Sequence, residues 1–287
     1  MALVAPAKAE PLATARDIRL HAGGAESNVA SHLAEMGIAT AWASALGDDA
    51  LGHRVCQSVR RHGVDTRWVG FDPNAPTGVY FKDPGRGVLY YRRDSAASRM
   101  SPATVASIPL EDAEIVHVSG ITPALSDSCA ALVEAVFERV AESSAILSFD
   151  VNYRRALWAE GVAGTVLRSL ANRADLVFVG LDEAQVLWGC RTAEDVRALL
   201  PEPERLVVKD GSVGATEFTG GDSVFVPAIP TDVVEAVGAG DAFAAGYLAA
   251  LLRGEPALDR LRSGHERARL VLLSTSDFID EAITGKA

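Results

Sequence analysis

The chain has 287 residues, of which 48% are hydrophobic, and this is enough for one α/β domain with an ample core and a small appendage. Its formal net charge of -11 argues against a general nucleic-acid or membrane-surface binder, because such proteins carry a basic excess. No apolar run reaches the length of a membrane span, and the apolar run at the N-terminus is too short for a secretory signal. We therefore expect a cytoplasmic protein.

The first part of the chain is predicted to alternate strands and helices. The expected elements are a strand at 15–22, a helix at 27–36, a strand at 40–46 and a helix at 48–62. Gly23 and Gly24 stand between the first strand and the first helix, where they let the backbone face a ligand or serve in a plain turn. The alternation favours a mostly parallel sheet with helices on its faces.

The pattern changes over residues 64–93. Strand-like runs there are separated by Asp-Pro, Ala-Pro and Asp-Pro-Gly-Arg-Gly turns, which are typical of antiparallel hairpins. We therefore expect one domain over residues 1–287 that carries a small β lid, formed by about 11–22 and 64–93. The tyrosines and arginines at 90–93 suit a hydroxylated anionic ligand, although arginines also protect exposed strand edges.

The alternation of strands and helices resumes after the lid. The expected elements are a helix that begins at 101–102, a strand at 113–119, a helix at 126–143, a strand at 145–150, a helix at 161–171, a strand at 175–179, a helix at 182–188, a strand at 205–209, a hairpin at 213–227 and a last helix at 256–275. Ligands of open α/β sheets gather beyond the carboxyl ends of the strands. This places Asn152, Tyr153 and Arg154 in the expected pocket, although a lone arginine after a strand is common.

Two glycine-containing turns are candidate anion sites. Lys209 is followed by Asp-Gly-Ser-Val-Gly, a loop that matches neither a P-loop nor a dinucleotide fingerprint. Farther along, Gly238, Ala239 and Gly240 carry no bulky side chains, so their amides and the positive end of the next helix can hold an anion. Asp241 at the mouth of that helix could move a proton, but considered alone it is more often an ordinary helix-start residue.

The cysteines and histidines give no sign of a disulfide or a metal centre. Cys56, Cys129 and Cys190 are odd in number, far apart and set in apolar helical segments. This favours buried free thiols in a reducing compartment. The six histidines show no ligand spacing.

Two segments resemble the signatures of the ribokinase-like, or phosphofructokinase-B-type, sugar kinases: GGAESNVASHLAEMG and GAGDAFAAGYLAALL. The similarity runs over nearly the whole chain. Within that family the sequence looks most like the 2-keto-3-deoxygluconate kinases, on the segments TGVYF, YYRRDSAASRMSP, VHVSGITPALS, SFDVNYR and VVEAVGAGDAFAAGYLAALL, in this order. The resemblance implies the fold predicted above, and lids of this kind often pair to form homo-oligomers in the family.

The resemblance also implies an activity, with Mg²⁺ as cofactor. The γ-phosphoryl group of ATP would pass to the primary hydroxyl of 2-keto-3-deoxygluconate and give 2-keto-3-deoxy-6-phosphogluconate. By similarity, Asp241 would take the proton from that hydroxyl, and the amides of Gly238, Ala239 and Gly240 would hold the developing charge. The residues expected at the sugar are Gly23, Gly24, Asn28, Tyr80, Tyr90, Tyr91, Arg92, Arg154, Asp241 and Asp277. Those expected at ATP are Asn152, Tyr153, Arg154, Lys209, Asp210, Gly211, Ser212, Val213, Gly214, Gly238, Ala239, Gly240 and Asp241.

The arginines favour an acid sugar over a neutral one. A carboxylate can accept charge-assisted hydrogen bonds from Arg92 and Arg154, whereas a neutral hexose offers them no charge partner. A neutral-sugar kinase of the fructokinase or ribokinase type remains an alternative, as does a non-catalytic sugar or nucleotide sensor on the same scaffold. The sequence does not choose between the gluco and galacto epimers of the acid.

Three features depart from the family pattern. Glu235-Ala236-Val237 replaces the usual Asp-Thr-Thr run, so the backbone amides are expected to suffice. The Asn-x-x-Glu motif keeps only Glu183, which would act on magnesium through water, since this ion prefers to keep waters and bind substrate phosphates. Asp94 stands where the 2-keto-3-deoxygluconate kinases often have glycine, beside the proposed carboxylate pocket.

The beginning of the chain is a further departure. Met1-Ala-Leu-Val-Ala-Pro resembles the end of a strand and its turn, so the central sheet is expected to lack about one strand, with a usual length of roughly five to six residues. Without an inner strand, the neighbouring strands leave backbone N–H and C=O groups unpaired and apolar surface exposed. Extension of the N-terminus by upstream codons is then expected to raise the melting temperature.

Overall fold

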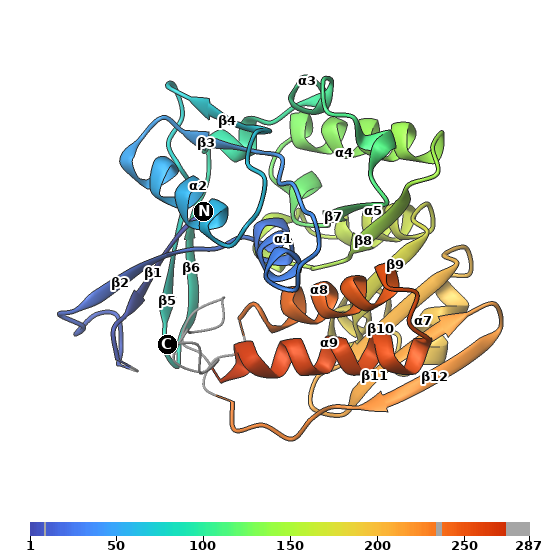
Figure 1. Cartoon of the computed structure of the whole chain (residues 1–287). Coiled ribbons are helices and arrows are strands. Elements are labelled where there is room, and N and C mark those ends of the chain that lie inside the picture. The colour runs from blue at the N-terminus through green and yellow to red at the C-terminus, as the bar shows by residue number, and fades with distance from the viewer. Residues whose placement is uncertain (9, 234–236, 274–287) are drawn as a thin grey trace.

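The computed structural model describes residues 1–8, 10–233 and 237–273. These residues form two sheets of four and six strands, a separate strand pair and the helices that cover them (Figure 1). Asp277, expected at the sugar, lies outside the described residues, so its role stays a prediction.

The larger sheet is the centre of the fold, with the strand order β12-β11-β10-β9-β8-β7. Its strands are β7 (Ile115–Ser119), β8 (Ile146–Asp150), β9 (Leu176–Gly180), β10 (Arg205–Asp210), β11 (Gly214–Thr219) and β12 (Asp222–Pro227). The first four run parallel, and the hairpin of β11 and β12 continues the sheet antiparallel. The predicted mostly parallel sheet is therefore confirmed.

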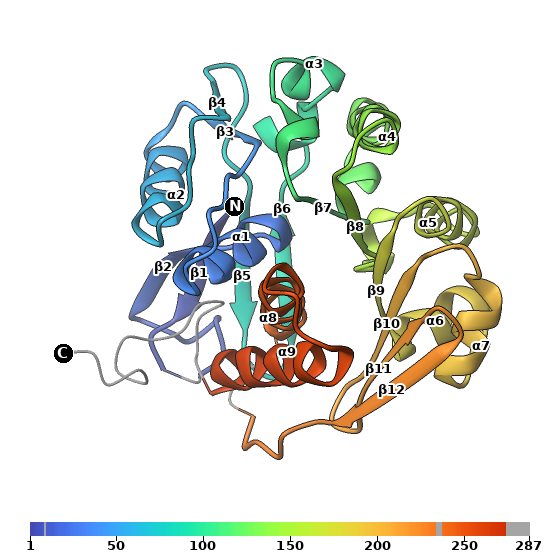
Figure 2. The same cartoon turned by 45° about the vertical axis from the view of Figure 1, so that its right-hand side comes forward.

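Helices cover both faces of this sheet, which Figure 2 shows nearly edge-on. One face carries α4 (Asp127–Ala141), α5 (Ala163–Ala171), α6 (Leu181–Trp188) and α7 (Ala193–Leu199), and the other carries α1 (Ala25–Glu35), α8 (Ala239–Leu252) and α9 (Ala257–Leu272). Each face has its own apolar core, because strands buried on both sides need cover on both. The helix α7 was not among the predicted elements.

The smaller sheet has the strand order β2-β1-β5-β6 and stands beside α1 at one edge of the body (Figure 1). Its strands are β1 (Ala2–Pro6), β2 (Ile18–Ala22), β5 (Val79–Asp83) and β6 (Gly87–Tyr91). The predicted hairpin of β5 and β6 is present and antiparallel. The opening residues form the strand β1, which pairs with both β2 and β5.

The strand β4 (Val69–Asp72) differs from the prediction of a continuous antiparallel hairpin region over 64–93. It pairs in parallel with β3 (Ser44–Gly47), and α2 (Ala50–Arg61) connects the two. Such a strand-helix-strand unit places its strands parallel, and it keeps β4 out of the smaller sheet. Only the second half of the predicted 64–93 segment therefore belongs to that sheet.

Most other predicted elements are present, with ends that differ by a few residues. The remaining short helices are η1 (Ala96–Arg99), α3 (Pro102–Val105), η2 (Leu110–Asp112), η3 (Thr122–Ala124) and η4 (Arg155–Leu157). Asp94 has a φ of 55°, a conformation that glycine adopts readily, and its side chain is exposed. The cysteines Cys56, Cys129 and Cys190 are buried and free, as predicted. Among the described residues, no helix has both the length and the apolar character needed to cross a bilayer.

Candidate active site

A large cavity of about 1080 Å³ lies where the carboxyl ends of β8, β9 and β10 meet the first turns of α1 and α8. The smaller sheet supplies part of its wall through Tyr80, Tyr90 and Arg92. Loops that follow parallel strands all emerge at one edge of the sheet, so side chains far apart in sequence gather there. The cavity therefore joins the two sheets at the place where the sequence predicted ligand contacts.

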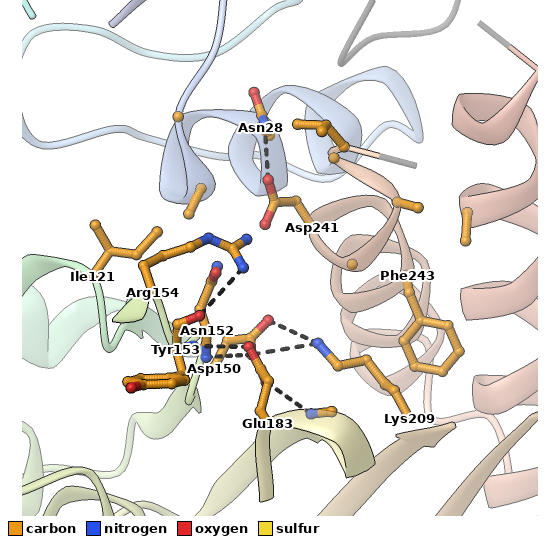
Figure 3. Close-up of a pocket in the computed structure, with 18 of the residues that line it drawn as sticks. Asn28, Ile121, Asp150, Asn152, Tyr153, Arg154, Glu183, Lys209, Asp241 and Phe243 are labelled. Atoms are coloured by element: carbon orange, nitrogen blue, oxygen red, sulfur yellow. Dashed lines mark hydrogen bonds and ion pairs between the residues drawn. The ribbon is translucent and has the colours of Figure 1, made fainter. Parts of the chain in front are cut away.

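Asp241 lies in the first turn of α8 and faces α1 across the cavity (Figure 3). Its Oδ2 accepts a hydrogen bond of 2.8 Å from Nδ2 of Asn28, whose side chain is 2% exposed. Gly238 is the N-cap residue of α8 with a φ of 89°, a conformation that strains any residue with a Cβ. The turn thus presents backbone N–H groups and a carboxylate to the same space.

Lys209 at the end of β10 forms an ion pair with Asp150 at the end of β8, with 3.1 Å between Nζ and Oδ2. Burial alone would lower the pKa of Lys209, but the charges of Asp150 and Glu183 raise it above its usual value. A Cβ added to Gly240 would lie 3.6 Å from Nζ, so the ammonium group sits directly below the first turn of α8. This permanent positive charge adds to the field of the helix end and makes the turn an anion site.

Glu183 on α6 is held from both sides by the backbone. Its Oε1 accepts from the Tyr153 amide at 2.8 Å, and its Oε2 accepts from the Gly180 amide at 2.9 Å. Burial first, and then the charge of Asp150, raise the pKa of Glu183. Since both oxygens already accept hydrogen bonds, Glu183 suits a contact with a hydrated ion better than direct ligation. The described residues contain no cluster of three acidic, histidine or cysteine side chains that could hold a metal ion.

Arg92 and Arg154 reach the cavity from different elements. The guanidinium of Arg92 stacks on Tyr90, with 4.4 Å from Cζ to the ring centroid, and Tyr90 stacks on the buried ring of Tyr80. Burial lowers the pKa of Arg92, and the nearby charge of Arg154 lowers it further. The side chain of Arg154 begins beside Ile121 and extends toward Asp241 (Figure 3). Two guanidinium groups in one cavity repel each other, and an anion that binds both offsets this repulsion.

Most predicted site residues line this cavity. They are Gly24, Asn28, Tyr80, Tyr90, Arg92, Asn152, Tyr153, Arg154, Glu183, Lys209, Gly211, Ser212, Gly214, Gly238, Ala239, Gly240 and Asp241. Side chains alternate along β6, so Tyr90 and Arg92 face the cavity while Tyr91 points to the other face of the sheet and is 65% exposed. Tyr91, which was predicted to bind the sugar, therefore does not line this cavity.

Three further predicted residues do not line the cavity. Gly23 pairs through its backbone with Met1, which leaves the next residue, Gly24, to face the cavity. Asp210 and Val213 occupy the tight turn between β10 and β11, where the Val213 amide donates to the Asp210 carbonyl. The side chain of Val213 is exposed, because this turn directs it away from the sheet.

Several residues of the cavity were not among the predicted site residues, and Asp150 and Glu26 are two charged examples. Asp150 is the partner of Lys209, and its position at the end of a predicted strand, two residues before Asn152, was the available signal. Glu26 on α1 accepts hydrogen bonds from the hydroxyls of Ser119 at 2.7 Å and Thr122 at 2.8 Å, and so fixes the turn that carries Ile121. Nothing in a helix-start glutamate indicates such a long-range contact.

Comparisons with known proteins agree with this arrangement. The model of the family described as pfkB family carbohydrate kinase matches residues 1–281. The 2-dehydro-3-deoxygalactonokinase of Haloferax volcanii is 35% identical over 279 residues, which cover 94% of this chain and 87% of that protein. The 2-dehydro-3-deoxygluconokinase of Thermoproteus tenax is 36% identical over 244 residues, which cover 82% of this chain and 74% of that protein.

The fold is also similar to that of solved structures. The crystal structure of a PfkB protein from Polaromonas sp. JS666 superposes with a TM-score of 0.88 at 30% identity, and the match covers all of this chain and 97% of that one. The fold is thus shared over the full length of the chain.

Proposed function

The chain belongs to the pfkB family of carbohydrate kinases and is a phosphotransferase that acts on a sugar hydroxyl, and we propose that its acceptor is 2-keto-3-deoxygluconate or its galacto epimer. ATP is the proposed donor, and the product is the 6-phosphate of the acid. The observation that carries this proposal is the presence of Arg92 and Arg154 in one cavity with Asp241. A sugar acid supplies the carboxylate that these arginines require.

The proposed chemistry begins at Asp241. Its carboxylate takes the proton of the primary hydroxyl, while the hydrogen bond from Asn28 holds it in position. The amides of Gly238 to Gly240 then meet the negative charge of the transferred phosphoryl group, and the ammonium of Lys209 lies beneath the same turn. The arrangement stabilises charge where it develops, which is the main requirement of phosphoryl transfer.

We place the nucleotide on the other side of Asp241 from the arginines. Gly211, Ser212 and Gly214 line the cavity there and face the phosphates. Magnesium would be held mainly by the nucleotide phosphates, where it would neutralise their charge, and Glu183 would contact it through water because both of its oxygens are engaged by backbone amides. Asn152 and Tyr153, also expected at ATP, line the cavity beside Arg154 (Figure 3).

The smaller sheet is proposed to act as a lid and as a dimer surface. Its outer side has a shallow apolar hollow of about 360 Å³ lined by Leu12, Val79, Phe81, Leu89 and Tyr91. Apolar side chains in such a patch are typical of an interface. Pairing of two lids through this patch gives a homo-oligomer, and sedimentation equilibrium of wild type and Leu89→Asp tests it. A monomeric wild type would contradict the proposed dimer.

We also propose a cytoplasmic location, where buried free thiols stay reduced.

The proposed acceptor is tested by a coupled assay of ADP release with both epimers of the keto-deoxy acid, fructose, ribose and a nucleoside. We expect turnover with at least one acid and little with the neutral sugars. Preference for fructose or ribose would instead support the neutral-sugar alternative. Failure of every compound to stimulate ADP release would leave the sensor alternative.

A further inference from the structure

The helix α1 carries Asn28, which donates a hydrogen bond to the carboxylate of Asp241 (Figure 3). The placement of α1 therefore decides where this carboxylate points. At the N-terminal end of the helix, Glu26 accepts hydrogen bonds from the turn that follows β7. A helix that is held at one end only can still tilt, and a tilt would move Asn28.

The buried face of α1 is unusually polar. Ser27, Ser31 and His32 are at most 2% exposed. The hydroxyls of Ser27 and Ser31 donate to carbonyls one turn earlier in their own chain segment, so these bonds do not attach α1 to its neighbours. His32 differs from them, because its ring is hydrogen-bonded to another helix.

Arg267 of α9 reaches His32 past α8. Its Nε and Nη2 donate to Nδ1 of His32 at 3.2 Å and 2.9 Å, and Nη2 also donates to the carboxylate of Glu35. Gly246 of α8 leaves room for this side chain, since a Cβ there would lie 3.0 Å from Cβ of Arg267. A planar guanidinium bound to two residues of one helix fixes that helix in direction as well as in distance.

The helix α9 is itself fixed to the larger sheet. Nε2 of His265, which is 8% exposed, donates to the carbonyl of Val226 on β12 at 3.1 Å. Arg260 forms an ion pair with the buried Glu217 of β11. Arg267 belongs to the same helix, so it holds α1 in place relative to the sheet whose strand ends form the cavity.

We propose that Arg267 is a positioning residue for the phosphoryl transfer, which fixes the helix that aims Asp241 at the acceptor hydroxyl. It acts through Asn28, which lies one turn, or about 6 Å, before His32 on α1. Neither Arg267 nor His32 lines the cavity. The proposal rests on the proposed role of Asp241 as the base.

The first test is kcat of Arg267→Met, measured with whichever acceptor the wild type turns over. This variant keeps the aliphatic stem and removes the donors. We expect kcat to fall roughly tenfold to a hundredfold, the cost of a misplacement of about 1 Å at a catalytic group, while KM for ATP stays nearly constant. Arg267→Lys, which keeps donors for His32 and Glu35, should recover part of the loss. Active enzyme is counted by the stoichiometry of ATP binding in calorimetry, so a smaller folded fraction does not affect kcat.

Arg139→Met is the matched control. Arg139 of α4 also donates to a carboxylate and to backbone carbonyls, but it lies on the opposite face of the sheet. Its kcat should equal that of the wild type. A wild-type kcat in Arg267→Met, or an equal loss in Arg139→Met, would overturn the proposal.

Two substitutions of His32 separate positioning from packing. Asparagine and leucine are similar in size, but only the asparagine side chain offers an acceptor that can take the place of Nδ1. His32→Asn should keep much of the wild-type kcat, and His32→Leu should lose as much as Arg267→Met. Equal losses in the two His32 variants would show that packing alone matters, and the proposal would then fail.

Double-mutant cycles test the route through Asn28. Addition of Arg267→Met to Asn28→Ala should lower kcat little further, whereas losses that multiply would contradict the route. A readout without turnover is the coupling between Asn28 and Asp241 in urea unfolding, from both alanine variants and their combination. This coupling should vanish when Arg267→Met is present, and a coupling of wild-type size there would overturn the proposal. Failure of the proposed function is distinguishable, because a wild-type kcat in Asp241→Asn leaves the unfolding cycle unaffected.

Discussion

Arg92 and Arg154 place two guanidinium groups in the cavity, which favours an anionic ligand there. Truncation of either to alanine should raise KM for the sugar acid by roughly tenfold to a hundredfold, the effect of losing a hydrogen bond to a charged group. KM for ATP should stay nearly constant, because the nucleotide is proposed to lie on the other side of Asp241. Steady-state kinetics of the two variants provide the measurement.

Tyr91→Ala is the matched control for these variants. It removes a large side chain from the same strand as Tyr90, but on the outer face of the sheet. Its KM for the sugar acid should equal that of the wild type. An unchanged KM in both arginine variants would remove the basis for an acid substrate.

Lys209 and Asp150 form a nearly buried ion pair, so removal of one partner affects stability as well as chemistry. Lys209→Met leaves the Asp150 carboxylate buried without its cation, and we expect a loss of about 3–5 kcal/mol in the free energy of unfolding. The double variant with Asp150→Asn should recover most of this loss. Urea unfolding of the two single variants and the double variant measures the coupling. Additive losses would show that the pair contributes no interaction energy.

At the scale of elements, α8 and α9 pack so closely that one position admits only glycine. A Cβ on Gly246 would lie 2.3 Å from the carbonyl oxygen of Ser263, and the Ser263 hydroxyl already donates to the Gly246 carbonyl. Gly246→Ala should therefore lower the free energy of unfolding by about 1–3 kcal/mol, the usual effect of overpacking. Gly70→Ala in β4, which has open space at its Cβ, should change it little. Equal unfolding midpoints for the two variants would contradict this account of the helix pair.

Local patterns predicted the elements that surround the cavity. The glycine turn before α8 and the polar residues after β8 are short-range features. The sequence therefore indicates each of these elements together with the residues at its boundary. The cavity contacts of Asn152 and Lys209 follow because parallel strands end at one edge. These are the parts of the site that a sequence can reveal.

Features that depend on long-range pairing were not predictable in the same way. The run Tyr90, Tyr91, Arg92 offers aromatic and basic side chains on both faces of a strand, so its pattern does not show which face meets the ligand. Whether β4 would join β3 or the hairpin depends on a connection through α2, not on its own residues. Partners such as Glu26 and Ser119 lie 93 positions apart, and no local signal connects them.

At the scale of the whole molecule, a charged cluster connects α1 to α9. The Glu35 carboxylate accepts a hydrogen bond from Arg267 of α9 and is hydrogen-bonded to Nδ1 of His62. Arg267 also donates to Nδ1 of the buried His32. Burial alone would raise the pKa of Glu35, but its neighbours His32 and His62 and the charge of Arg267 lower it far below its usual value of 4.5. This cluster ties the helix that carries Asn28 to the helix that carries His265.

The pH dependence of stability follows from that lowered pKa. A carboxylate with a depressed pKa in the folded state contributes stability above its unfolded pKa and loses it as the pH falls through the folded pKa. Glu35→Gln should thus lower the melting temperature most near neutral pH, and the difference from the wild type should shrink as the pH falls well below 4.5. Glu138→Gln, at an exposed position on α4, is the control and should show no such trend. A difference that grows on acidification would contradict the assignment.

The central claim is that Asp241 takes the proton from the hydroxyl that receives the phosphoryl group. The most direct measurement is kcat of wild type and Asp241→Asn with MgATP and the preferred keto-deoxy acid, with nucleotide affinity measured separately by calorimetry. We predict a fall in kcat on the order of 10²–10⁴-fold, the usual effect of losing a general base, with ATP affinity largely retained. A kcat within a few fold of the wild type would contradict the account.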